Sequence, residues 1–284
     1  MNEIFATVIQ AAIGRWQTIT QITSRADSEV WRATLINGVQ VAVKITIGPG
    51  NEGLVAAREA AVIRAAGASA GRVLAGGRLI EGGSWLVTPW WHGPTLADQL
   101  AELRGKAAER TAHRVAARAA AQAAAALADL HQAGWVHGGV RAEHFIHTAH
   151  GVRLVDLAWA RGPAGSLPAD LDFPYIGTLH RLDAAEIARR LRANTLVTPT
   201  PEGDVHTFAR ALWHCWSGAW PTDPEADGAV PGKGRRAVDP LGWPGFEVAL
   251  ETALAPEPDV RPTATVLAGA LSLLAELEAV TRTP

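Results

Sequence analysis

Residues 134–160 read GWVHGGVRAEHFIHTAHGVRLVDLAWA, and this stretch decides the fold that we expect for the chain. It follows a long Ala-rich helix and opens with a short apolar run at Trp135, after which comes the turn His137-Gly138-Gly139. Two more apolar runs flank a tight turn at Gly151, and the second run leads into Asp156. The sequence therefore predicts strand, loop, strand, turn and strand, ending on an acidic residue.

The composition of the whole chain indicates a full apolar core and little net charge. The 284 residues, 48% of them apolar, suit one large domain or two lobes that share a cleft. The net charge of −2 gives no field that would recruit nucleic acid or an anionic membrane. Cys215 is the single cysteine, which excludes an internal disulfide and suits the reducing cytoplasm. The N-terminus lacks a basic segment followed by an apolar one, and no run of about 18 apolar residues occurs, so we expect neither a signal peptide nor a membrane span.

The first 90 residues alternate between β-rich runs and two helical patterns. Asn37-Gly38 lies between two β-rich runs, which is the strongest short-range signal for a β-hairpin. The expected elements are helices at 4–14 and 54–66 and strands at 16–22, 39–47, 73–79 and 84–89. This part of the chain therefore predicts a small β-rich lobe.

One lysine in this lobe has a candidate partner. Lys44 ends the run Val41-Ala42-Val43-Lys44, and strand alternation places Ala42 on the same face as Lys44. Glu59 follows fifteen positions later in the helix expected at 54–66. A resemblance to the protein kinase-like superfamily, described below, implies an ion pair between Lys44 and Glu59, with Glu52, at or before the start of that helix, as the weaker alternative. The structural alternative is an exposed strand lysine and a solvated carboxylate on the helix surface.

The rest of the chain predicts a larger and mainly helical part. The segment Trp90-Trp91-His92-Gly93-Pro94 separates the two parts and resembles a hinge. Helical patterns follow at 97–103, 109–133, from Asp204 onward, at 245–254 and at 263–280. Two segments rich in Gly, Pro and acidic residues, 161–181 and 223–240, read as long loops.

These segments together resemble the protein kinase-like superfamily over about residues 15–280. Val41–Lys44 matches its third-strand lysine motif, His137–His144 aligns without a gap with its catalytic loop, and Asp156-Leu157-Ala158 stands where the family has Asp-Phe-Gly. The His-Gly turn resembles aminoglycoside phosphotransferases, whereas Glu186, Asp204 and Arg261 resemble bacterial Ser/Thr protein kinases. The resemblance implies an α+β, bilobal protein kinase-like fold. Its small β-rich N-lobe would be residues 1–90 and its larger helical C-lobe residues 91–284, together forming one domain.

The resemblance also implies a nucleotide site for ATP or ADP with Mg²⁺. In the family the strand lysine reaches the phosphates, the helix glutamate holds the lysine, and the hinge contacts adenine. The positions that match are Val30, Ala42, Lys44, Glu59, Pro89, Trp90, Trp91 and Asp156, with Asp156 as the metal ligand. Three further positions carry structural roles, Asp204 holding the loop backbone and Glu186 pairing with Arg261.

The chain departs from the family where chemistry is required. Gly139 stands at the position of the catalytic Asp, and losing such a proton acceptor typically removes about 10²–10⁴-fold in rate. His144 replaces the metal-binding Asn and is a poor ligand for Mg²⁺, which prefers oxygen donors. The phosphate-covering loop has no glycine at its three glycine positions, Thr23, Arg25 and Ser28. We therefore predict no catalytic residue in the degenerate loop formed by His137, Gly139, Arg141 and His144.

These departures favour a pseudokinase, which keeps the fold as a nucleotide-sensing, regulatory or scaffolding subunit for a protein or peptide partner and binds ATP or ADP weakly. One alternative is an active, non-standard phosphotransferase on Ser or Thr of a protein or peptide, as in ribosomal-peptide maturation. It would need a carboxylate from elsewhere, for example Asp170, Asp172 or Asp183. The other alternative is a nucleotide-independent binding scaffold, in which Trp31, Trp90 and Trp91 fill the cleft.

Overall fold

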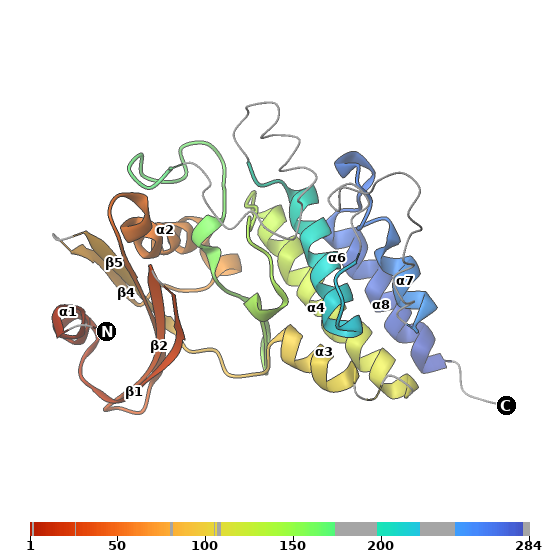
Figure 1. The fold of residues 1–284 in the computed structure, drawn as a ribbon, viewed down its shortest axis with the longest axis horizontal. Coiled ribbons are helices and arrows are strands. Elements are labelled where there is room, and N and C mark those ends of the chain that lie inside the picture. The colour runs from red at the N-terminus through yellow and green to blue at the C-terminus, as the bar shows by residue number, and fades with distance from the viewer. Residues whose placement is uncertain are drawn as a thin grey trace. The chain divides into compact units, whose positions relative to one another are not determined.

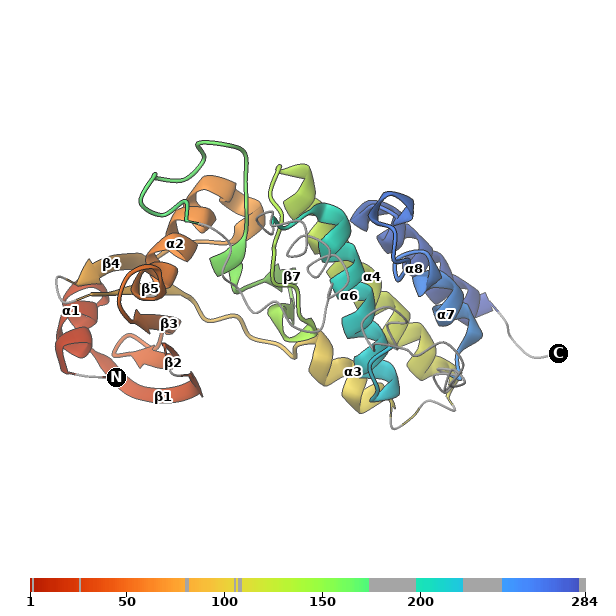
Figure 2. The same cartoon turned by 45° about the horizontal axis from the view of Figure 1, so that its top comes forward.

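The computed structural model describes residues 1–173, 198–221 and 242–280, apart from positions 2, 26, 80–81, 105 and 107–108. Within these residues the chain is α+β and divides into two compact units (Figures 1 and 2). Unit 1 comprises residues 1–92 and 156–174, and unit 2 comprises residues 93–155 and 175–284. Both units are discontinuous, because the chain leaves unit 1 at residue 92, returns at 156 and leaves again after 174.

Unit 1 is built on a five-stranded antiparallel sheet. The order across the sheet is β1-β2-β3-β5-β4, which leaves β1 and β4 as its edges. The strands are β1 (Trp16–Ser24), β2 (Ser28–Leu35), β3 (Gln40–Ile47), β4 (Ala75–Leu79) and β5 (Gly83–Pro89). Two register shifts interrupt the pairing of β1 with β2, and such irregularities are common at sheet edges.

The hairpin predicted at Asn37-Gly38 is confirmed between β2 and β3. The amide of Leu35 donates to the carbonyl of Val39 at 2.8 Å, and the Asn37 side chain accepts from the amide of Val39 at 3.1 Å. Gly38 has φ 82°, a left-handed conformation that glycine adopts at little cost. The turn therefore fixes the register that places Val30 opposite Lys44.

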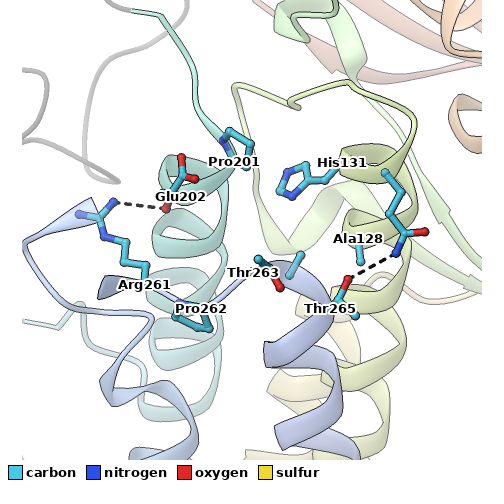
Figure 3. A pocket seen from close by; sticks show the side chains of 10 residues that line it. Ala128, His131, Pro201, Glu202, Arg261, Pro262, Thr263 and Thr265 are labelled. Carbon is cyan, nitrogen blue, oxygen red and sulfur yellow. Dashed lines mark hydrogen bonds between the residues drawn. The ribbon is translucent and has the colours of Figure 1, made fainter. Parts of the chain in front are cut away.

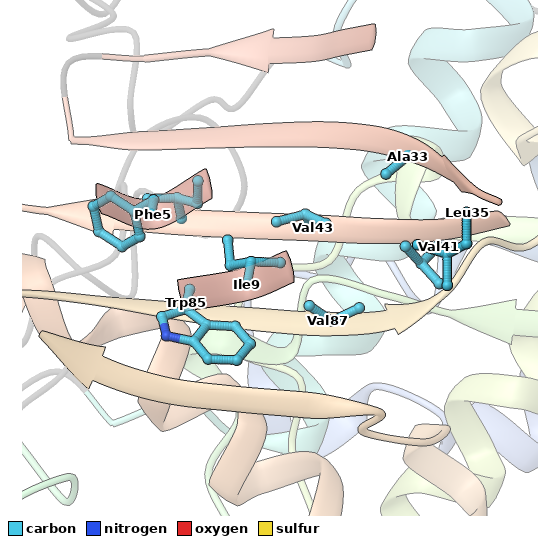
Figure 4. Close-up of a cluster of buried hydrophobic side chains, with 9 residues drawn as sticks. Phe5, Ile9, Ala33, Leu35, Val41, Val43, Trp85 and Val87 are labelled. Carbon is cyan, nitrogen blue, oxygen red and sulfur yellow. The ribbon is translucent and has the colours of Figure 1, made fainter. Parts of the chain in front are cut away.

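Because side chains alternate along each strand, one face of the sheet packs against α1 (Glu3–Ile13) and the other contacts α2 (Asn51–Ala66). Val41 and Val43 of β3 pack with Phe5 and Ile9 of α1 in the apolar cluster of Figure 4. On the opposite face the hydroxyl of Thr46 donates to the carbonyl of Gly53 and accepts from the amide of Ala56, both in α2. Lys44 has the same parity as Thr46, so it lies on the face that α2 covers.

Helix α2 begins three residues before the expected start at Leu54, so Glu52 lies in its first turn. The sequence did not indicate the true start of α2, because Gly53 interrupts the apolar pattern of the helix. The absence of a side chain at Gly53 is a packing requirement, since a Cβ there would lie 2.5 Å from the carbonyl oxygen of Gly48. A short 3-10 turn, η1 (Gly67–Ala70), follows the helix, and a second one, η3 (Leu157–Trp159), belongs to the returning segment of unit 1.

The described part of unit 2 contains helices and a small β-ribbon. The helices are α3 (Leu96–Arg104), α4 (Arg110–Gln132), α6 (Pro201–Ser217), α7 (Pro244–Glu251) and α8 (Ala264–Val280), with the 3-10 turns η2 (Ala142–His144) and η4 (Pro258–Val260). The ribbon pairs β6 (Phe145–Thr148) with β7 (Gly151–Leu154). Helix α4 buries a face made largely of alanines, and these small side chains allow α8 to pack along it.

The strand expected at Trp135 is reduced to a single β-bridge residue, Val136. Trp135 is buried, but it belongs to no strand of the described sheets. Its amide donates to the carbonyl of Leu130 at 3.1 Å, so the segment completes the C-terminal end of α4. None of the helices in the described ranges has the length and apolarity needed to cross a membrane.

Candidate functional site

In unit 1 the ammonium group of Lys44 lies between two carboxylates. Its Nζ is 2.6 Å from Oε2 of Glu59 and 2.6 Å from Oδ1 of Asp156. The exposed fractions of the three side chains are 17% for Lys44, 7% for Glu59 and 38% for Asp156. The ion pair predicted between Lys44 and Glu59 is therefore present, and Asp156 joins it from a segment more than a hundred residues away.

Asp156 reaches the lysine with an unusual backbone conformation. It has φ 61° and ψ 55°, and it is the one non-glycine residue of the described chain with positive φ. Non-glycine residues in this region cost of order 1–3 kcal/mol and persist where the surroundings hold them in place. The ion pair with Lys44 is one such restraint.

Two neighbouring side chains of α2 hold the segment that follows Asp156. Oε1 of Glu59 accepts from the amide of Leu157 at 3.1 Å, while its other oxygen binds Lys44. The guanidinium of Arg58 donates to the carbonyls of Ala158 and Ala160, the second at 2.8 Å. Arg58 is only 3% exposed. The sequence feature that could have indicated its role is its position next to Glu59 on a helix with an apolar face. Sequence reasoning missed it.

The charges around Lys44 and Arg58 shift their pKa values in opposite directions. Burial disfavours the charged amine of Lys44, but the negative charges of Asp156 and Glu59 outweigh this effect and raise its pKa above the ordinary value of 10.5. At Arg58 burial dominates and, despite the attraction of Asp172, lowers the pKa to about 10. Both side chains are therefore cationic at neutral pH.

Of the other residues predicted to bind nucleotide, some lie within the sheet and one lies at the end of β5. Val30 pairs with Lys44 in the sheet register and Ala42 pairs with Thr88, so Val30, Ala42 and Lys44 lie on one face. Pro89 ends β5 opposite Val41.

The tryptophans proposed to fill a cleft lie in different surroundings. Trp31 packs against the α1 cluster and its Nε1 donates to Glu29 at 2.9 Å, so it is on the face opposite Lys44. The ring of Trp90 lies 5.4 Å from the guanidinium of Arg32, a cation–π contact. Trp91 is half-buried. Trp31 is therefore wrongly assigned in the cleft-filling alternative.

In unit 2 a buried carboxylate holds the loop that resembles a catalytic loop. Oδ2 of Asp204 accepts from the amide of His137 at 2.6 Å, and Oδ1 accepts from the amide of Gly138 at 2.9 Å. His131 adds a third contact, with Nε2 3.0 Å from Oδ2. Asp204 is 3% exposed, so these partners satisfy a charge that has little access to water. The expected role of Asp204 in holding the loop backbone is present, whereas His131 was missed.

His137 is a structural residue of this loop. Its Nε2 lies 3.2 Å from the carbonyl oxygen of Val155, which can only accept, and its Nδ1 accepts from the amide of Gly139 at 3.2 Å. The geometry thus assigns a neutral imidazole with its proton on Nε2. The ring of His144 stacks on that of His137 with centroids 5.5 Å apart. Both ring nitrogens of His137 are used, so this residue cannot act as a base without breaking the loop.

The charged residues near this loop are paired with each other. Arg141 lies 3.2 Å from Glu143, and both side chains are about half exposed. Exposed pairs of this kind contribute about 0–1 kcal/mol. Nearby charges and hydrogen bonds, despite partial burial, lower the pKa of Glu143, so it is ionised at neutral pH.

The carboxylates that an active enzyme would require are engaged or lie outside the described residues. Asp170 is 2.6 Å from Arg78, and Asp172 is 3.7 Å from Arg161, all within unit 1. Asp183 and Glu186 lie outside the described residues, so the expected pair of Glu186 with Arg261 stays a prediction.

Arg261 itself donates to backbone carbonyls at the edge of a small pocket. Its partners are the carbonyl oxygens of Ala255, Pro256 and Glu202. The pocket, of about 240 Å³, lies between the end of α4 and the starts of α6 and α8 (Figure 3). His131, the residue that contacts Asp204, lines it.

The described residues contain no group of three or more His, Cys, Asp or Glu side chains able to hold a metal ion. A Mg²⁺ ion commonly binds one or two carboxylates and takes its other ligands from phosphate and water. Asp156 fits that pattern as a single protein carboxylate, and His144 does not, because its donor is nitrogen. No protein-family model and no curated protein matches this chain.

Proposed function

We propose that the chain is a pseudokinase: a bilobal, protein kinase-like protein that binds ATP or ADP weakly and acts on a partner protein rather than by phosphoryl transfer. The observation that supports this most is the lysine held between Glu59 and Asp156. One carboxylate is enough to neutralise a lysine, and the second one, Asp156, is 38% exposed, so it is accessible to a metal ion and to phosphates.

The charge of the Lys44 group predicts how nucleotide would bind. With all three side chains ionised the group carries one negative charge in excess, so it repels a bare polyphosphate. Bound Mg²⁺ would supply positive charge between Asp156 and the phosphates. Lys44 would orient the phosphates, and Glu59, a residue of α2, would keep Lys44 in place. We therefore expect nucleotide binding to depend on Mg²⁺.

The loop residues support the absence of phosphoryl transfer. Gly139 offers only its backbone amide, which donates to His137, and His137 has both ring nitrogens occupied. Glu143 is paired with Arg141, and Asp170 and Asp172 are paired with arginines. Each of these three carboxylates is thus engaged with an arginine, which opposes its use as the proton acceptor that a hydroxyl nucleophile needs.

The test is thermal unfolding with ATP or ADP, with and without Mg²⁺, for the wild type, Lys44→Ala and Asp156→Asn. A ligand at 100 times its dissociation constant stabilises the folded state by about 2.7 kcal/mol, which gives a readable shift. We expect a Mg²⁺-dependent shift that both substitutions remove. Asp156→Asn, which neutralises the excess charge, should bind metal-free ADP at least as well as the wild type does.

If the unfolding temperature shifts in none of these conditions, nucleotide binding is overturned and the nucleotide-independent binding scaffold is the remaining proposal. Transfer of phosphate to a Ser or Thr of a peptide, lost in Asp156→Asn, would overturn the pseudokinase assignment in favour of an active phosphotransferase. Arg15→Ala, an exposed arginine of unit 1, serves as a control that should change neither result.

A further inference from the structure

Helix α4 carries a row of three arginines in its first half. Arg110, Arg114 and Arg118 recur at every fourth residue, so they follow one face of the helix, which is labelled in Figure 2. The helix has no acidic residue before Asp129. We call these three residues the arginine row; all of it belongs to unit 2.

The arginine row is electrostatically unfavourable for the helix that carries it. Arg110, in the first turn, opposes the helix dipole at a cost of about 0.3–1 kcal/mol, an effect that falls off beyond that turn. Like charges four residues apart cost about 0.2–0.5 kcal/mol more per pair. Glu109, at the N-cap, makes no capping hydrogen bond, and neither Arg114 nor Arg118 forms an ion pair with a described residue. An anionic partner would relieve this repulsion.

A pocket lies at the C-terminal end of the arginine row. It has a volume of about 330 Å³ and brings together α3, α4 and the turn between β6 and β7. Its wall includes Arg118 itself, the amides Gln99 and Gln122, the apolar Val115, and His147, and no acidic residue lines it. Nε2 of His147 is buried without a hydrogen-bond partner among the described residues. The pocket therefore continues the row with polar donors and an apolar patch.

The spacing of the row matches an extended peptide. Four residues of α-helix rise about 6 Å, and alternate residues of an extended chain lie about 6.6–6.8 Å apart on one side. A strand with a carboxylate at every second position could thus place carboxylates beside Arg114 and Arg118, and its next side chain on that side would reach the pocket. We propose that the arginine row and its pocket are a docking surface for an extended acidic segment of a partner protein, with carboxylates at alternate positions.

The test uses the full chain and the labelled peptide Glu-Ala-Glu-Ala-Glu-Ala-Leu, acetylated and amidated at its ends. Fluorescence anisotropy would compare it with Glu-Glu-Glu-Ala-Ala-Ala-Leu, which has the same composition and charge but the wrong spacing. We expect the double variant Arg114→Ala/Arg118→Ala to bind the first peptide about tenfold more weakly, since two exposed ion pairs are lost. Its thermal stability should not fall, because alanine favours the helix and repulsion is removed.

A matched control is Arg15→Ala/Arg64→Ala, which removes two exposed arginines of unit 1. This variant should bind the alternating peptide as the wild type does. Equal binding of the two peptides, equal weakening by the two double variants, or no binding to the wild type would each overturn the proposal. None of these outcomes depends on nucleotide, so a result that overturns the docking surface is distinct from a result that overturns nucleotide binding.

The chain's own sequence contains the same pattern of acids, Asp223, Glu225 and Asp227, outside the described residues. The variant Asp223→Asn/Glu225→Gln/Asp227→Asn removes these acids and so distinguishes the acidic segment of a partner protein from this segment of the chain as the occupant of the arginine row. Equal peptide binding by this variant and the wild type supports a partner protein. Peptide binding that appears only in the variant would show that the row is occupied within the chain, and would overturn docking of a partner.

Discussion

At the scale of single residues, Lys44 has the most consequential environment in the described chain. Its ammonium lies between two carboxylates and offsets the repulsion that they would otherwise exert on each other at short range. The family resemblance predicted Glu59 as a partner of Lys44, but it assigned Asp156 to the nucleotide and its metal ion. The structure shows that Lys44 links α2 to the segment that begins at Asp156.

Lys44→Met should lower the free energy of unfolding by about 2–3 kcal/mol, less than for a fully buried ion because the site is partly exposed. The loss arises because Glu59, at 7% exposure, is left without its cation. Urea denaturation would measure it. Lys44→Met/Glu59→Gln should recover part of the loss, and a double variant as unstable as the sum of the two single variants would contradict coupling between them.

His147 gives the stability of the protein a dependence on acid. Burial lowers its pKa from the ordinary value of 6.5, so the unfolded chain takes up the proton more readily than the folded chain. Stability is therefore full above about pH 6.5 and falls as the pH drops below that value toward the folded-state pKa. Urea midpoints between pH 7.5 and 5 should fall less steeply in His147→Gln. His150→Gln, an exposed neighbour in the same hairpin, should keep the wild-type slope.

At the scale of elements, α2 shows how packing overrides helix propensity. Gly53 lies inside the helix, where alanine would ordinarily be favoured. A Cβ at this position would, however, meet the carbonyl oxygen of Gly48 at 2.5 Å. Gly269 of α8 provides a contrast, since a Cβ there meets nothing within 4 Å.

The two glycines should therefore respond oppositely to the same substitution. Gly53→Ala should lower the free energy of unfolding by about 1–3 kcal/mol, because the backbone must shift to remove the clash. Gly269→Ala should raise it by about 0.5–1 kcal/mol through the lower entropy of the unfolded chain. Chemical denaturation of both variants checks this, and a gain of stability in Gly53→Ala would show that the loop at Gly48 yields easily.

At the scale of the whole molecule, unit 1 requires a segment that follows much of unit 2 in the sequence. Residues 156–174 supply Asp156 to Lys44 and carbonyls to Arg58, so residues 1–92 alone leave buried charges without partners. A fragment of residues 1–92 should therefore lack a cooperative thermal transition. Adding a synthetic peptide of residues 156–174 should restore near-ultraviolet circular dichroism, and a cooperative transition of the fragment without the peptide would contradict the dependence.

Local patterns in the sequence determined most of the elements. The alternation at Val41–Lys44, the Asn37-Gly38 turn and the apolar period of α4 each depend on residues a few positions apart, and such patterns are fixed by the geometry of strands and helices. They placed the hairpin and the face of Lys44, whereas the pairing of Lys44 with Glu59 was predicted from the family resemblance. They failed at Trp135, because its amide closes α4 rather than pairing in a sheet.

The tertiary structure alone decided which distant groups meet. Lys44 and Asp156 are 112 residues apart, and Arg58 and Ala158 are 100 residues apart. No period in the sequence encodes such contacts, because they depend on how the packed elements return the chain to unit 1. The left-handed backbone of Asp156, the buried Arg58 and the contact of His131 with Asp204 were likewise invisible in the sequence. Local propensity thus determined the elements, and burial with hydrogen-bond satisfaction determined the candidate site.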